Sequence, residues 1–299
     1  MGLGELLALI CALMWASAVI LYKYVGDTMR ANTLNLVKNS IALSLLVPTA
    51  FLIEKFALPE LTIKQWLIVA LSGYVGIAIA DTFYLKSLKY IGAGRTAIVG
   101  SLYSPFVVIL SILFLSEQLL LWQWFGFILV LLGVLIVTYQ RNNQEIEKSL
   151  MIKGSLFAAS SVFLNASSVV VIKPILEGDG FFWLVSLRML AGLFGMWVYL
   201  FIRGQVQQTV SEIAAPGHNW KGIAAASIFG GYIALLFWLA GFKYTEASTA
   251  SVLNETSTIF IVLMAWVFLK ERLSWRKIIG VMMTFVGVVI FLDLFSNTF

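Results

Sequence analysis

The chain has 299 residues, of which 61% are hydrophobic and only 12% are charged. A soluble fold of this length would lack the polar residues to cover its surface, so the composition excludes a soluble enzyme and predicts a membrane protein. The net charge of +5 is not gathered into a basic domain, so we expect no nucleic-acid partner.

Apolar stretches of about 20 residues, the length that spans the hydrocarbon core of a bilayer, follow one another almost without a break. The segments between them are too short to hold a soluble catalytic domain. We therefore predict an all-α integral membrane protein with ten transmembrane helices. The expected spans are 3–22, 31–53, 66–86, 93–115, 121–139, 152–173, 181–202, 220–242, 247–268 and 275–293.

The second half of the sequence repeats the first. The segment FLSEQLLLWQWFGFILVLLGVLI (114–136) matches FLKERLSWRKIIGVMMTFVGVVI (268–290) at an offset of 154 residues. YLKSLKYIGA (84–93) matches WLAGFKYTEA (238–247) at the same offset, and near the start of each half the offset is 150 residues. The order of features is therefore the same in both halves.

The repeat predicts the domain organisation. We expect a first five-helix repeat at 1–139, a connecting loop at 140–151 and a second five-helix repeat at 152–299. Because a unit with an odd number of crossings leaves its copy starting on the opposite face of the membrane, the two repeats should be inverted. One face of the expected bundle collects most of the Lys and Arg residues, which would place both termini outside the cytoplasm.

Two copies of an FL-x-E-x-L motif, each leading into a helix with glycines seven residues apart, resemble the EamA family of the drug/metabolite transporter superfamily. The resemblance covers nearly the whole chain and implies ten helices in inverted repeats. It also implies a central cavity lined mainly by helices other than the fifth and tenth, and alternating access without ATP hydrolysis. The matching residues are Phe114, Leu115, Glu117, Leu119, Gly126 and Gly133, and again Phe268, Leu269, Glu271, Leu273, Gly280 and Gly287.

The motif also has a physical interpretation. Glycines seven residues apart lie about 20° from each other around a helix and form a groove that permits close helix packing. Glu117 and Glu271 stand just before a helix, where a carboxylate can accept hydrogen bonds from the free N–H groups of the following helix. We expect both glutamates to cap helices.

Two cations within expected spans, Lys38 and Arg188, match at the 150-residue offset and should lie on facing elements across the central axis. One interpretation is a site for a carboxylate or phosphate group of the substrate, which an Arg can bind in bidentate fashion. The alternative is a salt bridge or a side chain that extends to the membrane surface, because each residue lies nearer one end of its helix than the middle.

Two carboxylates also lie within expected spans. Glu255 is near the middle of the ninth helix, where a carboxylate could bind and release protons during a transport cycle, or could instead make a static hydrogen bond or ion pair. Asp81, near the end of the third helix, is expected to be the partner of a nearby cation. The only cysteine, Cys11, is expected to be a small core residue.

Polar and aromatic side chains suited to a polar cavity occur in both halves, although aromatic residues in spans often serve packing alone. Pro105 should kink the fourth helix in its middle and is the candidate for a gating bend, since Ile259 replaces it in the second half. The candidate substrate-binding residues are Trp15, Asn35, Lys38, Asn39, Tyr84, Tyr103, Asn165, Arg188, Tyr232, Trp238, Asn254 and Glu255.

The leading interpretation is a secondary active transporter that moves small metabolites, such as amino acids or related organic solutes, outward across the cell inner membrane, with coupling to protons left open. The alternative in the same fold is a carrier of phosphorylated or nucleotide-linked solutes, and a channel or an intramembrane enzyme is less well supported. No catalytic constellation, P-loop or metal-ligand spacing is present, so we expect no cofactor or metal. A monomer and a homodimer both stay open.

Overall fold

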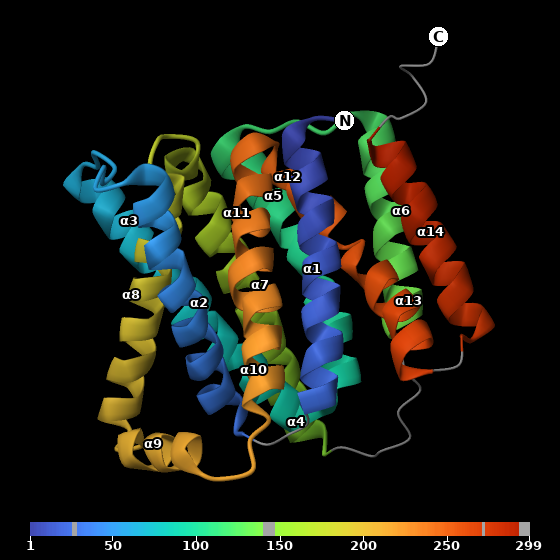
Figure 1. Ribbon diagram of the computed structural model, residues 1–299. Helices are drawn as coiled ribbons and strands as arrows, with labels where there is room; N and C mark the ends of the chain where they lie inside the picture. The colour runs from blue at the N-terminus through green and yellow to red at the C-terminus, as the bar shows by residue number, and fades with distance from the viewer. Residues whose placement is uncertain (26–28, 140–146, 271–272, 293–299) are drawn as a thin grey trace.

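The structure, a computed structural model, describes residues 1–25, 29–139, 147–270 and 273–292 (Figure 1). Within these residues it is a bundle of helices without strands. In chain order its elements are α1 (Leu3–Val25), α2 (Ala31–Glu54), α3 (Ile63–Gly73), η1 (Tyr74–Ala80), α4 (Asp81–Gly100), α5 (Tyr103–Leu115), α6 (Leu121–Thr138), α7 (Lys148–Leu176), α8 (Phe181–Ile202), α9 (Val206–Ala214), α10 (Trp220–Ser227), η2 (Ile228–Ile233), α11 (Ala234–Tyr244), α12 (Ala247–Asn254), α13 (Ser257–Leu269) and α14 (Trp275–Phe291).

Nine segments of the described residues are long and apolar enough to cross a membrane, and they overlap the first nine spans expected from the sequence. The helix at the tenth expected position, α14, has 17 residues, one fewer than α6. It lies along α6 at the side of the bundle, and the start of α1 and the end of α14 lie at the same end (Figure 1). The all-α prediction is thus confirmed for the described residues.

The repeated glycines hold α6 and α14 together. Gly126 lies against Gly287, and Gly133 lies against Gly280, so the two helices run antiparallel. A methyl group added at Gly133 would come within 2.6 Å of the Gly280 carbonyl oxygen, and one at Gly126 within 2.7 Å of the Gly287 carbonyl oxygen. The groove expected from the glycine spacing is therefore present, and it allows the two backbones to touch.

Glu117 caps a helix, as expected, but not the one that follows it in the chain. Its Oε1 accepts a hydrogen bond from the backbone N–H of Ala247 (2.6 Å), and its Oε2 accepts one from that of Ser248 (2.9 Å). These groups begin α12, in the other half of the chain. The expectation that Glu117 caps α6 is wrong, because α6 is capped locally by Gln123. Glu271 lies outside the described residues.

Two further glutamates bind at opposite ends of the α2–α8 pair, Glu54 between α2 and α8 and Glu212 between α2 and α9. At one end of the pair, Glu54 accepts hydrogen bonds from the N–H groups of Phe182 and Trp183, both 3.0 Å, which begin α8. At the other end, Glu212 accepts hydrogen bonds from the side chains of Thr33 (2.6 Å) and Arg30 (2.7 Å) at the start of α2. A carboxylate therefore fixes the end of α2 to the start of α8, and another fixes the start of α2 to α9.

Glu212 lies on α9, a short amphipathic helix that runs across one end of the bundle (Figure 1) and that is not among the ten expected spans. Burial of the Glu212 carboxyl opposes its ionisation, but the hydrogen bonds from Thr33 and Arg30 outweigh burial and hold its pKa below the ordinary value. The carboxylate is therefore charged at neutral pH, which favours its contact with Arg30.

Candidate functional site

Four spans lose regular α-helical geometry at the level of the bundle centre, in pairs related by the 154-residue offset. The third and eighth spans contain the π-helical segments η1 and η2, which begin at Tyr74 and Ile228. The fourth span is interrupted after Gly100 and the ninth after Asn254, so that Ser101 and Glu255 stand at equivalent breaks. Interrupted helices expose backbone groups inside a membrane protein and commonly line its binding site.

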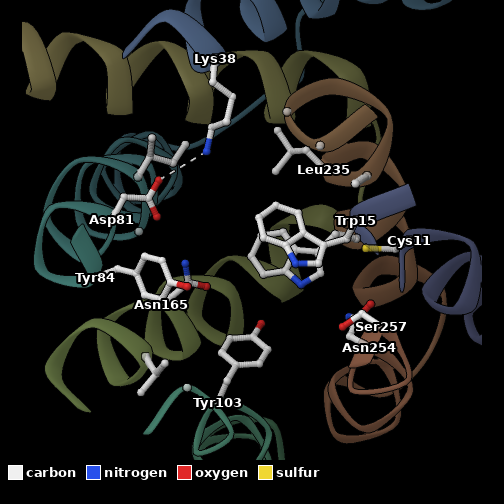
Figure 2. Close-up of a pocket in the computed structure, with 18 of the residues that line it drawn as sticks. Cys11, Trp15, Lys38, Asp81, Tyr84, Tyr103, Asn165, Leu235, Asn254 and Ser257 are labelled. Carbon is white, nitrogen blue, oxygen red and sulfur yellow. Dashed lines mark ion pairs between the residues drawn. The ribbon is translucent and has the colours of Figure 1, made fainter. Parts of the chain in front are cut away.

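A cavity of about 420 Å³ lies between these segments (Figure 2). Its volume falls within the range of small-molecule sites, about 300–1,000 Å³. Residues from each of the first four spans and from the sixth to ninth spans line it, whereas α6 and α14 contribute none of the described lining residues. This is the lining that the resemblance implied.

Most of the candidate substrate-binding residues come together at this cavity. Asn35 lies behind its wall, and the hydroxyl of Tyr232 pairs with Thr49 Oγ1 at 2.6 Å outside it. The candidates that line the cavity are Trp15, Lys38, Asn39, Tyr84, Tyr103, Asn165, Arg188, Trp238, Asn254 and Glu255.

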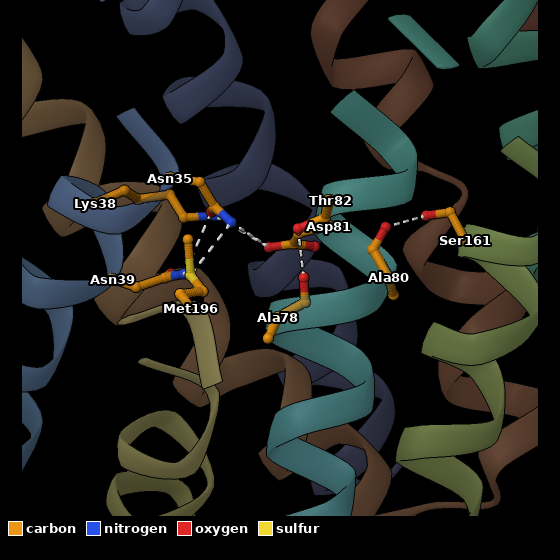
Figure 3. Close-up of polar contacts among 9 residues, drawn as sticks. All are labelled: Asn35, Lys38, Asn39, Ala78, Ala80, Asp81, Thr82, Ser161 and Met196. Atoms are coloured by element: carbon orange, nitrogen blue, oxygen red, sulfur yellow. Dashed lines mark hydrogen bonds and ion pairs between the residues drawn. The ribbon is translucent and has the colours of Figure 1, made fainter. Parts of the chain in front are cut away.

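Lys38 and Asp81 form an ion pair on one wall of the cavity, with 3.9 Å between Lys38 Nζ and Asp81 Oδ2 (Figures 2 and 3). Asn35 Nδ2 donates to the same carboxylate oxygen at 3.1 Å, and Asn39 Nδ2 donates to Asn35 Oδ1 at 3.2 Å. The expectation that Asp81 partners a cation is confirmed. For Lys38, the salt-bridge alternative therefore has direct support.

Arg188 is placed differently. Its side chain is 2% exposed, and its Nε and Nη2 donate hydrogen bonds to Ser72 Oγ (2.8 Å) and Ser168 Oγ (3.1 Å). The indole ring of Trp238 lies 5.4 Å from its Cζ atom. Within the described residues, no carboxylate oxygen lies within 4.0 Å of the guanidinium nitrogens.

Glu255 stands at the break of the ninth span and lines the cavity, where hydrogen-bonding groups of Ser104 face it. It forms no ion pair with any described cation. Beside it, the side-chain oxygen and nitrogen of Asn254 are buried without a hydrogen-bond partner among the described residues, and so is the hydroxyl of Tyr103. Burying polar atoms without hydrogen-bond partners costs free energy unless a ligand or a water molecule supplies the partner.

The position of Pro105 corrects the sequence prediction. Pro105 lies in the first turn of α5, after the interruption of the fourth span, and not in the middle of a helix. A proline there removes an N–H that the first turn leaves unpaired in any case. The ninth span is interrupted at the equivalent place, although Ile259 replaces the proline. The break therefore does not depend on Pro105.

Several residues of the site were not anticipated as such. Cys11 is buried, as expected for a core residue, but it also borders the cavity, as do Ser161 and Ser257. Gly76 and Gly230 line the cavity from η1 and η2. The 154-residue offset that relates these two glycines was a usable signal, since glycines at equivalent positions of two repeats point to a shared packing requirement.

The fold and the cavity define a multi-pass membrane protein with a chamber inside its helical bundle, lined by apolar, aromatic and a few charged side chains, an architecture typical of solute carriers. The sequence profile of the EamA-like transporter family matches residues 2–139 and 152–292. The chain belongs to this family.

Named relatives agree with this assignment. An uncharacterized transporter of Archaeoglobus fulgidus is 21% identical over 96% of this chain and 97% of its own length. Protein PecM of Dickeya dadantii is 24% identical over 67% of this chain and 65% of its own length. Another A. fulgidus transporter, 32% identical, matches over only 27% of its own length. A solved crystal structure with a TM-score of 0.80 and 16% identity covers 98% of both chains and shows a shared fold.

Proposed function

We propose that this protein is a secondary active transporter that moves small organic metabolites across the cell inner membrane by alternating access. The observation that carries the proposal is the cavity itself, which is enclosed by interrupted spans from both halves and lined by buried polar groups without partners. Family membership supports a transporter rather than an enzyme.

The proposal includes a ten-helix architecture of two inverted repeats, 1–139 and 152–299. Three observations support it: the family profile matches once in each half, the π-helical segments and helix breaks recur at one offset, and α6 runs antiparallel to its counterpart α14. Inverted copies that share a central site can exchange conformations to open the site to either side in turn. We take α14 as the tenth span.

The substrate proposed from the sequence is an amino acid or a related organic solute. The cavity volume suits a molecule of that size, and aromatic rings beside charged groups suit an amphipathic one. The alternative, a phosphorylated or nucleotide-linked solute, relied on two free cations, but Lys38 is paired with Asp81. That pairing favours the smaller, less charged solutes.

Counterflow into proteoliposomes tests this function. Vesicles that hold the purified protein and one unlabelled solute should accumulate the same labelled solute from outside, because a carrier exchanges substrate through a single alternating site. A panel of amino acids and organic acids, assayed with and without a pH gradient, would reveal the substrate, the direction and the coupling. Linear flux that never saturates would instead indicate a channel.

We further propose that Glu255 carries the coupling proton. It lies in the cavity at a helix break and has no cationic partner among the described residues. The variant Glu255→Gln should exchange substrate but lose acceleration by a pH gradient, since the amide cannot bind or release a proton. The measurement is uptake against external pH in proteoliposomes. An unaltered pH response would rule out this role.

The gating role of Pro105 stays a prediction, and the helix break itself does not require the proline. If a bend near Pro105 controls access, Pro105→Ala should slow counterflow severalfold without loss of folded protein in detergent. Counterflow at the wild-type rate would reject the role.

A further inference from the structure

Arg188 is a buried cation that forms no ion pair with the described residues. The Arg188 side chain is 2% exposed and so lies away from bulk solvent. The Asp81 carboxylate, which is paired with Lys38 on the cavity wall, lies more than 4.0 Å from the Arg188 guanidinium nitrogens. The Trp238 ring and two hydroxyls stabilise the cation only in part. The Asp81 carboxylate, which is shared with Lys38, attracts the guanidinium only from this longer distance. Burying a charge without a directly paired counter-ion is costly, so a ligand that supplies one would stabilise the site.

The hydroxyls that contact Arg188 do not depend on it. Ser72 Oγ donates its own hydrogen bond to the backbone oxygen of Ser168 (3.0 Å), and Ser168 Oγ donates to that of Asn165 (2.8 Å). Both serines serve Arg188 as acceptors only. Removing the guanidinium would therefore leave neither hydroxyl hydrogen without a partner, so the two serines position Arg188 without needing it for their own hydrogen bonds.

The Arg188 guanidinium also has N–H groups that donate no hydrogen bond to the described residues. It carries five N–H groups, and the described residues accept hydrogen bonds from Nε and Nη2 only. The remaining N–H groups have no protein acceptor among those residues, and Arg188 lines the cavity. Gly76 of η1 makes the placement possible, because a methyl group there would lie 2.9 Å from Nη2 and 2.5 Å from Ser168 Oγ.

We propose that Arg188 binds a single anionic group, a carboxylate or another oxyanion, on the transported solute. The proposal rests on the transport function above and specifies its substrate class: an organic monoanion whose apolar part lies among the aromatic rings of Trp15, Tyr103 and Trp238. One anionic group is expected and not two, because the second cation of the cavity, Lys38, already has Asp81 as its partner.

The test compares melting temperatures of the full-length protein in detergent, with acid and amide pairs as probes: indole-3-acetate against indole-3-acetamide, and phenylacetate against phenylacetamide. A ligand that binds only the folded state raises the melting temperature. The variant is Arg188→Met, whose unbranched side chain is uncharged and shorter than that of arginine. The matched control is Arg203→Met, at the end of the same helix, where the guanidinium stacks on Tyr199.

Three results are expected. Without probe, Arg188→Met should melt at or above the wild-type temperature, because it removes a buried charge that forms no ion pair with the described residues. The acids should stabilise the wild type and Arg203→Met by several degrees more than the amides do. Arg188→Met should lose that difference. A fall of several degrees in unliganded Arg188→Met would show a structural cation and overturn the proposal, as would equal shifts by acid and amide or no shift by any acid.

Proteoliposome counterflow separates this inference from the function it rests on. If neutral solutes exchange and acids do not, the protein is a carrier and the role of Arg188 in anion binding is wrong. If no solute in the panel exchanges, the transport function itself fails, whatever the melting temperatures show. If acids exchange in the wild type and not in Arg188→Met, both proposals stand.

Discussion

Replacing Gly133 with alanine is expected to lower the stability of the folded protein by about 1–3 kcal/mol, which is the usual cost of inserting a methyl group into a packed contact. The new methyl group would come within 2.6 Å of the Gly280 carbonyl oxygen and of the Thr284 backbone nitrogen, so α6 and α14 must separate. The alanine has higher helix propensity than glycine, which offsets about 1 kcal/mol of the loss. Thermal unfolding in detergent measures the effect.

Gly100→Ala is the matched control, because Gly100 also lies in a helix but a methyl group there meets nothing within 4 Å. It should leave the melting temperature unchanged or raise it. If Gly133→Ala has the same melting temperature as Gly100→Ala, the close approach of α6 and α14 does not contribute to stability, and the interpretation of the glycine repeat is wrong.

Replacing Glu117 with alanine is expected to destabilise the protein by about 2–3 kcal/mol, since hydrogen bonds to a charged acceptor contribute about 1.5–3 kcal/mol. The change would leave the N–H groups of Ala247 and Ser248 and the hydroxyl of Ser248 without their acceptor. These groups begin the span that carries Glu255, so transport should fall as well. Melting temperature and counterflow measure the two effects.

Two comparisons make the Glu117 prediction specific. Glu117→Gln keeps one carbonyl oxygen as an acceptor and should be intermediate. Glu60→Ala removes an exposed carboxylate that makes no hydrogen bond or ion pair with the described residues, and it should have little effect. Wild-type stability in Glu117→Ala would contradict the assignment of Glu117 as the cap of α12.

The sequence predicts the elements whose cause is local. Apolar length predicts the spans, and glycine spacing predicts a groove, because both depend on one helix and its solvent. The helix that packs into the α6 groove is α14, which carries the same glycine spacing in the second half of the sequence. Even the gathering of Trp15, Tyr103 and Arg188 at one cavity was accessible, since buried polar side chains in spans must face the protein interior.

What the sequence does not predict depends on contacts between distant segments. The neighbours of Glu117 in the chain suggest a cap for α6, and only the packing of the two halves brings α12 to it. The π-helical turns have no residue signature besides glycine, and at the end of η1 the Ala80 carbonyl oxygen accepts a hydrogen bond of 2.7 Å from Ser161 Oγ of the distant helix α7 (Figure 3). Likewise, only the packed structure shows that Asp81 forms an ion pair with Lys38 and not with Arg188.

The orientation of the two halves determines on which side of the membrane two positions lie, one at the start of α6 and one at the start of α14, at opposite ends of the bundle (Figure 1). Gln118→Cys and Ser274→Cys, each in a Cys11→Ala background, would be exposed to a membrane-impermeant maleimide on intact cells and on inverted vesicles. Two inverted halves around one cavity require the two positions to react from opposite sides. Reaction of both positions from the same side would contradict the inverted architecture and the alternating-access transport proposed from it.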